Sequence, residues 1–220
     1  MKESNKRKKI IELCRQMNNS GLNQGTSGNI SALHNGYMLI TPSGIPYEDM
    51  HVDQIARVSL VHDNGEWEGP CKPSSEWHFH RAILKSNVTF GAVIHTHSTY
   101  STILSISRKS IPACHYMVAA FGGNNVRCAD YATFGTAALS DNILLAMQDR
   151  SACLLANHGM VAAGQDLDKA MWAAVELEAL AQQYYHASLQ GGMVILPGSE
   201  IDDILERFKD YGLRSENSDK

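Results

Sequence analysis

The sequence predicts an α+β fold, in which a mostly antiparallel central sheet is flanked by helices in an α/β/α layered arrangement. The chain has 220 residues, of which 44% are hydrophobic, and this suits one domain with a sizeable buried core. Short strand candidates and helical segments mix without strict βαβ alternation, which favours a mostly antiparallel sheet. No internal repeat or low-complexity linker is visible, so we expect a single domain over residues 1–220, with about 215–220 as an unstructured tail.

The N-terminal third predicts one long helix followed by small strands. Ile10, Cys14 and Met17 recur at helical spacing within residues 5–20, and Gly21 follows as a stop signal. Two hairpin-like pairs follow: strands at 30–33 and 37–40 around the turn His34-Asn35-Gly36, and strands at 58–62 and near Trp67 around the turn 63–65.

The rest of the chain mixes strands with longer helices. The first helix opens at Pro73-Ser74-Ser75-Glu76, where the two serines are candidate caps. We expect helices at 73–85, at 98–107, at 136–149, from Asp166 or Asp168 to about 191, and at about 199–210. We expect strands at 90–95 and 152–155.

Composition excludes several classes of protein. The net charge is −4, so the basic excess of a general nucleic-acid binder is missing. Five cysteines without a C-x-x-C pair argue against a disulfide framework or a cysteine zinc site. The polar N-terminus shows no signal peptide, and no apolar run approaches the ~18 residues that span a bilayer. We therefore expect a cytoplasmic protein without a membrane partner.

Three histidines form a candidate metal site. His95 and His97 end an apolar strand, and residues two apart on a strand point to the same side. His158 ends a second strand, and Gly159 allows a sharp turn after it. Three imidazoles with one open position are typical of a catalytic zinc. Hydrogen-bonded surface histidines would give the same spacing, so both interpretations stand at this point.

Three loops rich in small residues are candidate anion sites. The start of the helix at Ser74 and Ser75 offers free N–H groups and hydroxyls that suit a phosphate, and Glu76 could reach a metal or act as a base. An ordinary helix cap explains the same residues. The loops 25–29 and 41–44 could also wrap an anion, although each by itself is more often a simple turn.

Taken in order, these segments resemble the class II aldolase family. The resemblance rests on Asn23-Gln24-Gly25-Thr26-Ser27-Gly28-Asn29, Thr41-Pro42-Ser43-Gly44, Pro73-Ser74-Ser75-Glu76, His95-Thr96-His97 and Asn157-His158-Gly159. Segments 111–123, 131–136 and 208–214 are similar to the fuculose phosphate aldolase branch in particular, and the resemblance covers nearly the whole chain.

The resemblance implies a role for each matching residue. His95, His97 and His158 would bind one divalent ion per subunit, most often Zn²⁺, with Mn²⁺ or Co²⁺ as alternatives. Glu76 would be a fourth ligand in the empty site and a catalytic acid/base once substrate displaces it. Tyr116 would reach into a neighbouring subunit's site and handle the proton on the aldehyde-side oxygen, within a homotetramer. The substrate would contact Gly28, Asn29, Ser43, Gly44, Ser74 and Ser75 in a phosphate pocket, and Phe134 and Tyr211 around the aldehyde.

The implied reaction cleaves a ketose 1-phosphate, such as L-fuculose 1-phosphate, into dihydroxyacetone phosphate and a small aldehyde such as lactaldehyde. Alternative substrates are a 5-deoxypentulose 1-phosphate and methylthioribulose 1-phosphate. A pentulose 5-phosphate 4-epimerase is a rival, but that branch typically has aspartate in place of Glu76 and a longer C-terminal part. A scaffold like the adducin head domain is another, but such proteins lose the metal ligands that this chain keeps. Ser43 stands where the fuculose phosphate branch usually has threonine, and both carry a hydroxyl.

Overall fold

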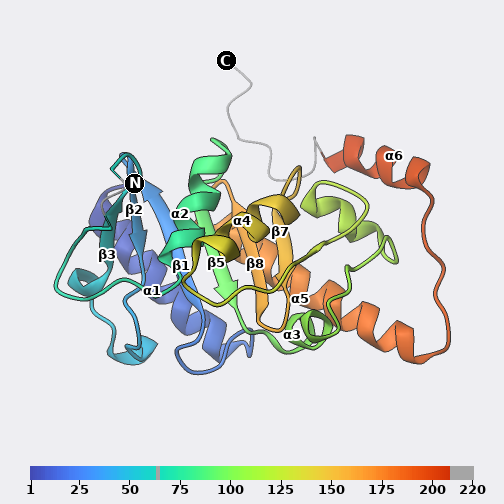
Figure 1. The fold of residues 1–220 in the computed structure, drawn as a ribbon, viewed down its shortest axis with the longest axis horizontal. Helices are drawn as coiled ribbons and strands as arrows, with labels where there is room; N and C mark the ends of the chain where they lie inside the picture. Colours follow the sequence, from blue (N-terminus) through green and yellow to red (C-terminus); the bar gives the residue numbers. More distant parts are fainter. Residues whose placement is uncertain (63–64, 209–220) are drawn as a thin grey trace, which may run out of the picture.

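The computed structural model describes residues 1–62 and 65–208 of the chain. Within these residues, eight strands form one sheet in the order β4-β3-β2-β1-β5-β8-β7-β6 (Figure 1). Neighbouring strands are antiparallel except β6 and β7, which confirms the predicted mostly antiparallel sheet. The strands are β1 (Asn29–His34), β2 (Tyr37–Ile40), β3 (Ala56–Ser59), β4 (Trp67–Glu68), β5 (Ala92–Thr96), β6 (Cys128–Ala129), β7 (Ala152–Leu155) and β8 (Gly159–Gly164).

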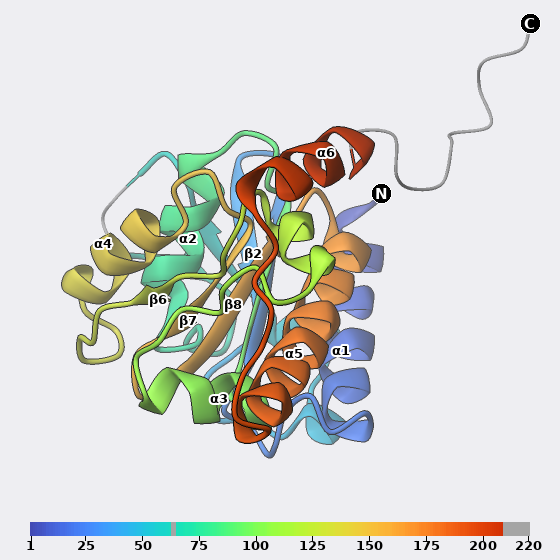
Figure 2. The same cartoon turned by 90° about the vertical axis from the view of Figure 1, so that its right-hand side faces the viewer.

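Helices cover both faces of the sheet. Figure 2 shows α2 and α4 on one face and α1 and α5 on the other, with α3 at the bottom and α6 at the top. The helices are α1 (Glu3–Asn19), α2 (Trp77–Ser86), α3 (Thr99–Ile106), α4 (Ala137–Ala146), α5 (Leu167–Leu189) and α6 (Gly198–Phe208), with short 3₁₀ helices η1 (Tyr47–Asp49), η2 (Val52–Gln54) and η3 (Tyr116–Phe121). In the described part of the chain, no helix is both long and apolar enough to cross a membrane.

The sheet divides the interior into two cores, and successive side chains of β5 alternate between them. Ala92 and Ile94 join the core that includes α1 and α5, and Val93 joins the core that includes α2 and α4. All five residues of β5 are buried, as expected for a strand covered on both faces. By the same alternation His95 faces the α2 side, where its ring meets Phe79 edge-on at 5.5 Å between centroids.

The hairpin predicted around His34-Asn35-Gly36 is present. Asn35 and Gly36 form its two-residue turn, with φ values of 46° and 80°. Consecutive positive φ values match the twist of the flanking strands, and asparagine followed by glycine tolerates them best. This turn fixes the register of β1 and therefore the position of Asn29, the first residue of that strand.

One prediction about local structure was wrong, and one strand was missed. The helix expected from Pro73 begins only at Trp77, because the backbone N–H of Ser74 donates to Thr41 O at 2.9 Å and holds this segment beside the end of β2. Strand β8 was not predicted at all. Its sequence, Gly-Met-Val-Ala-Ala-Gly, has few β-branched residues, and its strand state depends on pairing with β5 and β7 on either side. Tyr211 and the tail expected from about residue 215 lie outside the described residues.

Candidate active site

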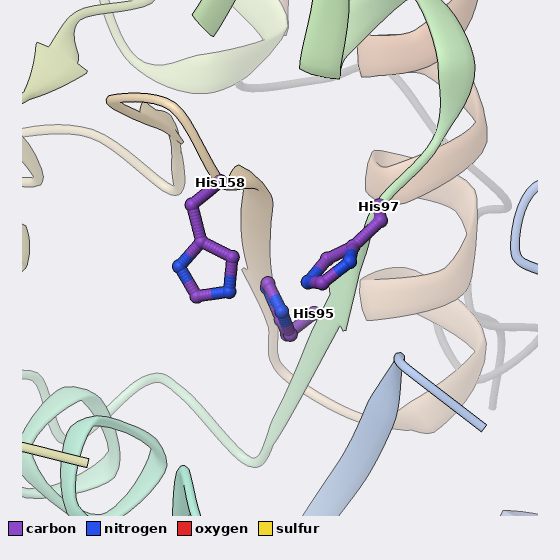
Figure 3. A group of neighbouring side chains, drawn as sticks. All are labelled: His95, His97 and His158. Carbon is purple, nitrogen blue, oxygen red and sulfur yellow. The ribbon is translucent and has the colours of Figure 1, made fainter. Parts of the chain in front are cut away.

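The three predicted metal ligands meet where β5 ends and β8 begins. His95 lies in β5, His97 comes one residue after that strand, and His158 lies in the turn from β7 to β8. Figure 3 shows the three rings gathered around one point. Their candidate ligand nitrogens all lie within 4.8 Å of one another. The site is therefore built from residues 63 positions apart in sequence (158 minus 95), brought together by antiparallel pairing of β5 and β8.

Glu76 closes the fourth side of this histidine cluster. Its Oε2 lies 3.2 Å from His95 Nε2, and its Oε1 lies 3.2 Å from His158 Nε2. The carboxylate is 5% exposed and is held from behind by Asn29, whose Nδ2 donates to Oε2 at 2.9 Å. A carboxylate removed from water among three imidazoles is typical of a metal ligand set.

The polar atoms that face this point lack ordinary partners. Among the described residues, His95 Nε2, His97 Nε2 and Glu76 Oε1 are buried without a hydrogen bond of acceptable geometry. His95 Nδ1 lies 2.8 Å from the backbone oxygen of Met160, to which it must donate, so the lone pair of Nε2 points into the cluster. Buried unpartnered donors and acceptors are costly, and a divalent metal ion would satisfy all three. The residues present therefore fit a metal.

The electrostatics of the cluster favour the metal-binding forms of Glu76 and His97, whereas burial of His95 is outweighed by the Glu76 carboxylate, which raises the pKa of His95. Burial opposes ionisation of Glu76, but the adjacent His95 and His158 outweigh it and hold the pKa of that carboxyl far below its usual range. Burial, reinforced by positive charge on His95 and His158, lowers the pKa of His97 to about 4. A carboxylate and a neutral imidazole are the forms that bind metal ions.

The predicted phosphate loops converge on the same edge of the sheet. Ser43 N donates to Lys72 O at 3.0 Å, and Ser74 N donates to Thr41 O at 2.9 Å, so the loops 41–44 and 72–76 run side by side. A third loop, 25–29, reaches Glu76 through Asn29 and lies against β5 at Gly28, where an added Cβ would lie only 2.8 Å from the backbone oxygen of His95. Glycine is required there because the backbones approach so closely.

Comparison with known proteins decides the family. Residues 8–185 match the family described as Class II Aldolase and Adducin N-terminal domain. The chain belongs to this family. A 5-methylthioribulose-1-phosphate/5-deoxyribulose-1-phosphate aldolase from Rhodospirillum rubrum is 48% identical over 203 residues, covering 92% of this chain and 90% of that protein. An L-fuculose phosphate aldolase from Escherichia coli K12 is 46% identical over 210 residues, covering 95% and 96%.

A solved structure supports the same assignment. It is an L-fuculose 1-phosphate aldolase with a TM-score of 0.90 and 38% identity, and the match covers 95% of this chain and 98% of that one. The protein is thus a class II aldolase, a lyase that acts on sugar phosphates and depends on a divalent metal, for which His95, His97 and His158 provide the cluster.

Two of the three aromatic site candidates lie within the described residues, and the class II aldolase places them differently. The loop that carries Phe134 lies beside the phosphate loops, since a Cβ on Gly135 would lie 3.1 Å from the backbone oxygen of Ser75. Phe134 itself is 63% exposed. Tyr116 is 50% exposed and begins η3, which packs against α5 and α6. Figures 1 and 2 both draw α6 at the top and α3, which follows the metal ligands, at the bottom, so η3 lies away from this chain's own cluster.

Sequence reasoning missed a polar group directly behind the aldolase site. His78 and His80 lie two residues apart on a predicted helix, where their side chains diverge, so the sequence does not single out His80, yet its side chain is wholly buried and bonded to Asn29. No local signal distinguishes it from His78, which is exposed, because burial depends on which face of α2 meets the sheet. Two surface hollows, of about 520 and 470 Å³, are lined by none of the predicted site residues.

Proposed function

We propose that this class II aldolase reversibly cleaves L-fuculose 1-phosphate, or a ketose 1-phosphate of similar shape, to dihydroxyacetone phosphate and a small aldehyde. The observation that carries the proposal is Glu76, a buried carboxylate 3.2 Å from both His95 and His158. It ends the loop 72–76, which runs beside the loop 41–44. The two relatives described above support a ketose 1-phosphate, because both are named for such substrates.

In the proposed reaction, the phosphate binds at Gly28, Asn29, Ser43, Gly44, Ser74 and Ser75. Backbone N–H groups and hydroxyls suit this anion in a chain of net negative charge, since they bind it without a cluster of lysines. Holding the phosphate fixes the ketose carbonyl at a set distance from the histidine cluster. Orientation of this kind accounts for a large part of many enzymatic rate enhancements.

His95, His97 and His158 would hold Zn²⁺, with Glu76 as the fourth ligand until substrate arrives. The ion, when bound, supplies Lewis acidity that stabilises the negative charge developing on the substrate's oxygen atoms. Glu76 then acts as the acid/base at the carbon that becomes part of dihydroxyacetone phosphate. Because Glu76 lies beside the cluster, a small rotation of its side chain would change it from a metal ligand to an acid/base.

The aldehyde side of the site belongs to a second copy of the chain in this proposal. Tyr116 of the partner subunit moves the proton of the hydroxyl on carbon four, and Phe134 and Tyr211 shape the space around the aldehyde. The half-exposure of Tyr116 and the packing of η3 against α6, at the end of the molecule away from α3, support a role across an interface, within a homotetramer. A cytoplasmic location stays a prediction.

A 5-deoxypentulose 1-phosphate or methylthioribulose 1-phosphate is the second candidate substrate. The Rhodospirillum rubrum relative named for these compounds is as similar to this chain as the Escherichia coli enzyme, at 48% and 46% identity. These substrates differ from L-fuculose 1-phosphate only on the aldehyde side, where the proposed Phe134 and Tyr211 contacts lie. A pentulose 5-phosphate 4-epimerase is disfavoured by the glutamate at position 76.

The substrate is tested in the direction of synthesis. The zinc-loaded protein is incubated with dihydroxyacetone phosphate and, in parallel, with L-lactaldehyde, acetaldehyde or (methylthio)acetaldehyde, and the ketose phosphates are identified by mass spectrometry and NMR. We expect the highest kcat/KM with L-lactaldehyde. A clear preference for either of the other two aldehydes would assign the second candidate. Failure to condense any aldehyde, with zinc bound, would overturn the proposal.

A further inference from the structure

A chain of buried hydrogen bonds runs from the interior to the candidate acid/base. Ser31 Oγ lies 2.7 Å from His80 Nδ1, His80 Nε2 lies 2.5 Å from Asn29 Oδ1, and Asn29 Nδ2 donates to Glu76 Oε2 at 2.9 Å. Ser31 and Asn29 are two residues apart on β1, so both side chains point to the α2 face of the sheet. His80 lies about one helical turn after Glu76 and faces the same side.

When Glu76 is ionised, the donors and acceptors of these three hydrogen bonds fit only one arrangement. A carboxylate accepts only, so Asn29 must turn its NH₂ group towards Glu76 and its carbonyl oxygen towards His80. His80 Nε2 must then carry a hydrogen to donate to that oxygen. Nδ1 of the neutral ring is left as an acceptor, and the hydroxyl of Ser31 donates to it.

The surroundings of His80 keep it in this neutral form. The imidazole is wholly buried, with Phe79 stacked at 4.8 Å between ring centroids. Burial, reinforced by positive charge on His95, lowers the pKa of His80 to about 3. The ring therefore offers one donor and one acceptor, as the chain of hydrogen bonds requires.

Without His80, only the repulsion between the Asn29 oxygen and the Glu76 carboxylate distinguishes the two ends of the Asn29 amide. The amide of an asparagine can rotate by half a turn at little steric cost because its oxygen and nitrogen are nearly equal in size. The rotated amide would present its oxygen to the Glu76 carboxylate, and two acceptors facing one another in a buried site repel. The Nε2–H of His80 prevents this rotation by requiring an oxygen on its side.

We propose that His80 is a positioning residue for the aldolase reaction, which fixes the amide of Asn29 so that its NH₂ group holds Glu76 at the metal cluster. The inference rests on the proposed role of Glu76 as metal ligand and acid/base. His80 acts on Glu76 through Asn29, which the proposed function also places in the phosphate pocket. Outer partners of metal ligands typically contribute 10- to 100-fold to metal affinity or activity, and we expect an effect of this size.

Two amide substitutions form a matched test. In His80→Gln, the longer side chain places an NH₂ group near the position of Nε2 and can still donate to Asn29. In His80→Asn, the side chain is one methylene shorter, so it keeps the bond to Ser31 and loses the reach to Asn29. A third variant, Ile83→Val, trims a buried residue of the same helix outside the hydrogen-bond chain and controls for general loss of stability.

Zinc affinity is measured by competition with a chromophoric chelator, and kcat and KM with the ketose phosphate that the wild type accepts. We expect His80→Asn to lower zinc affinity or kcat by 10- to 100-fold, and His80→Gln to recover most of that loss. Ile83→Val should lower the melting temperature while leaving both quantities near those of the wild type. Equal values for His80→Asn and the wild type would overturn the proposal, as would equal losses in His80→Asn and Ile83→Val.

A spectroscopic readout remains if a variant does not fold. Long-range ¹H–¹⁵N NMR spectra of the wild-type protein distinguish a protonated from an unprotonated ring nitrogen. We expect His80 to show hydrogen on Nε2 and none on Nδ1 from pH 6 to 8. Hydrogen on Nδ1 alone, or on both nitrogens, would overturn the proposal. The NMR and zinc measurements need no substrate, so they still decide the role of His80 if the proposed sugar phosphate is wrong.

Discussion

Each histidine of the cluster is held by a different part of the structure. His95 is fixed at its second nitrogen by the backbone of Met160, on the paired strand β8. His158 is fixed through its backbone N–H, which donates to Leu155 O at 3.0 Å and lies 3.4 Å from Ser105 Oγ. His97 follows β5 directly and lies against Gly159 at the start of β8. The cluster is therefore preorganised, and removal of one ring leaves the other two in place.

This preorganisation leads to a prediction about metal content. In His158→Ala, two imidazoles and Glu76 remain, and we expect zinc affinity to fall by at least 100-fold because one ligand of a four-ligand set is gone. The melting temperature of the metal-free protein should change little, since His158 is only half-buried. Elemental analysis after dialysis measures the loss. His186→Ala, at an exposed position on α5, is the control and should keep about one zinc per chain.

One substitution at Glu76 can test proton transfer separately from metal binding. Glu76→Gln keeps the shape and one oxygen that can approach the metal, but an amide cannot exchange a proton near neutral pH. We expect most zinc to be retained and kcat to fall by about 100- to 10,000-fold, the usual contribution of a general acid–base group. Steady-state kinetics at saturating zinc measure this. A kcat near that of the wild type would show that the proton is moved by another group.

His80 also predicts how stability depends on pH. Its pKa of about 3 in the folded protein is below the 6.5 of an exposed histidine. Between these values the unfolded chain binds a proton that the folded chain does not, so stability is complete above pH 6.5 and falls as the pH is lowered towards 3. From pH 7.5 to 5 we expect the metal-free wild type to lose about 2 kcal/mol more than His80→Gln in urea unfolding. Parallel pH profiles would contradict a neutral buried His80.

At the scale of elements, the contact between β5 and β8 brings the ligands together. Glu178 of α5 adds to this by accepting hydrogen bonds from Ser98 Oγ, Tyr100 N and both polar groups of Ser101, at 2.7 to 2.9 Å. These residues open α3 directly after His97. A carboxylate at a helix N-terminus satisfies donors that otherwise lack partners. The strand that carries two ligands is thus held at its side by β8 and at its end by α5.

Gly159 tests how closely β5 and β8 must approach. A Cβ at this position would lie 2.4 Å from the backbone oxygen of Thr96 and 3.1 Å from His97 Cδ2. Gly159→Ala therefore has to separate the strands beside the cluster, and we expect at least a tenfold loss of zinc affinity with a lower melting temperature. Gly198→Ala is a matched control, because no atom lies within 4 Å of its added Cβ. Similar zinc affinities in the two variants would contradict the proposed close packing.

At the scale of the whole molecule, the groups that the proposed reaction needs lie in two separate regions of the chain. The metal cluster and phosphate loops share one edge of the sheet, but η3, which begins at Tyr116, packs with α6 at the other end (Figures 1 and 2). If catalysis requires both the metal cluster of one chain and Tyr116 of another, activity is a property of the assembly.

Mixing two inactive variants tests this arrangement. Tyr116→Phe chains keep an intact Glu76, and Glu76→Gln chains keep an intact Tyr116, so a mixed interface can combine both groups in one site. After random reassembly at equal ratio, about one site in four should be active if each site draws on two neighbouring chains. Turnover per site is measured on mixtures shown by native mass spectrometry to be hetero-oligomers. No recovered activity in such mixtures would exclude a shared site.

The sequence by itself determined the family, the sheet class and the three histidines of the cluster. His95 and His97 were recognisable because spacing of two on an apolar strand places both rings on one side, whatever packs around the strand. The hairpin at Asn35-Gly36 was recognisable because its backbone angles are a local property of those two residues. Both signals are short in range. The order of the small-residue loops along the chain indicated the family.

Only the tertiary structure decided what supports the ligands. His78 and His80 are equivalent in the sequence, but the sheet covers the face of α2 that carries His80, and there Asn29 joins it to Glu76. Strand β8 exists because β5 and β7 supply partners for its backbone, and its own residues favour a strand only weakly. Burial and pairing depend on residues far apart in the chain, and local propensity does not contain that information.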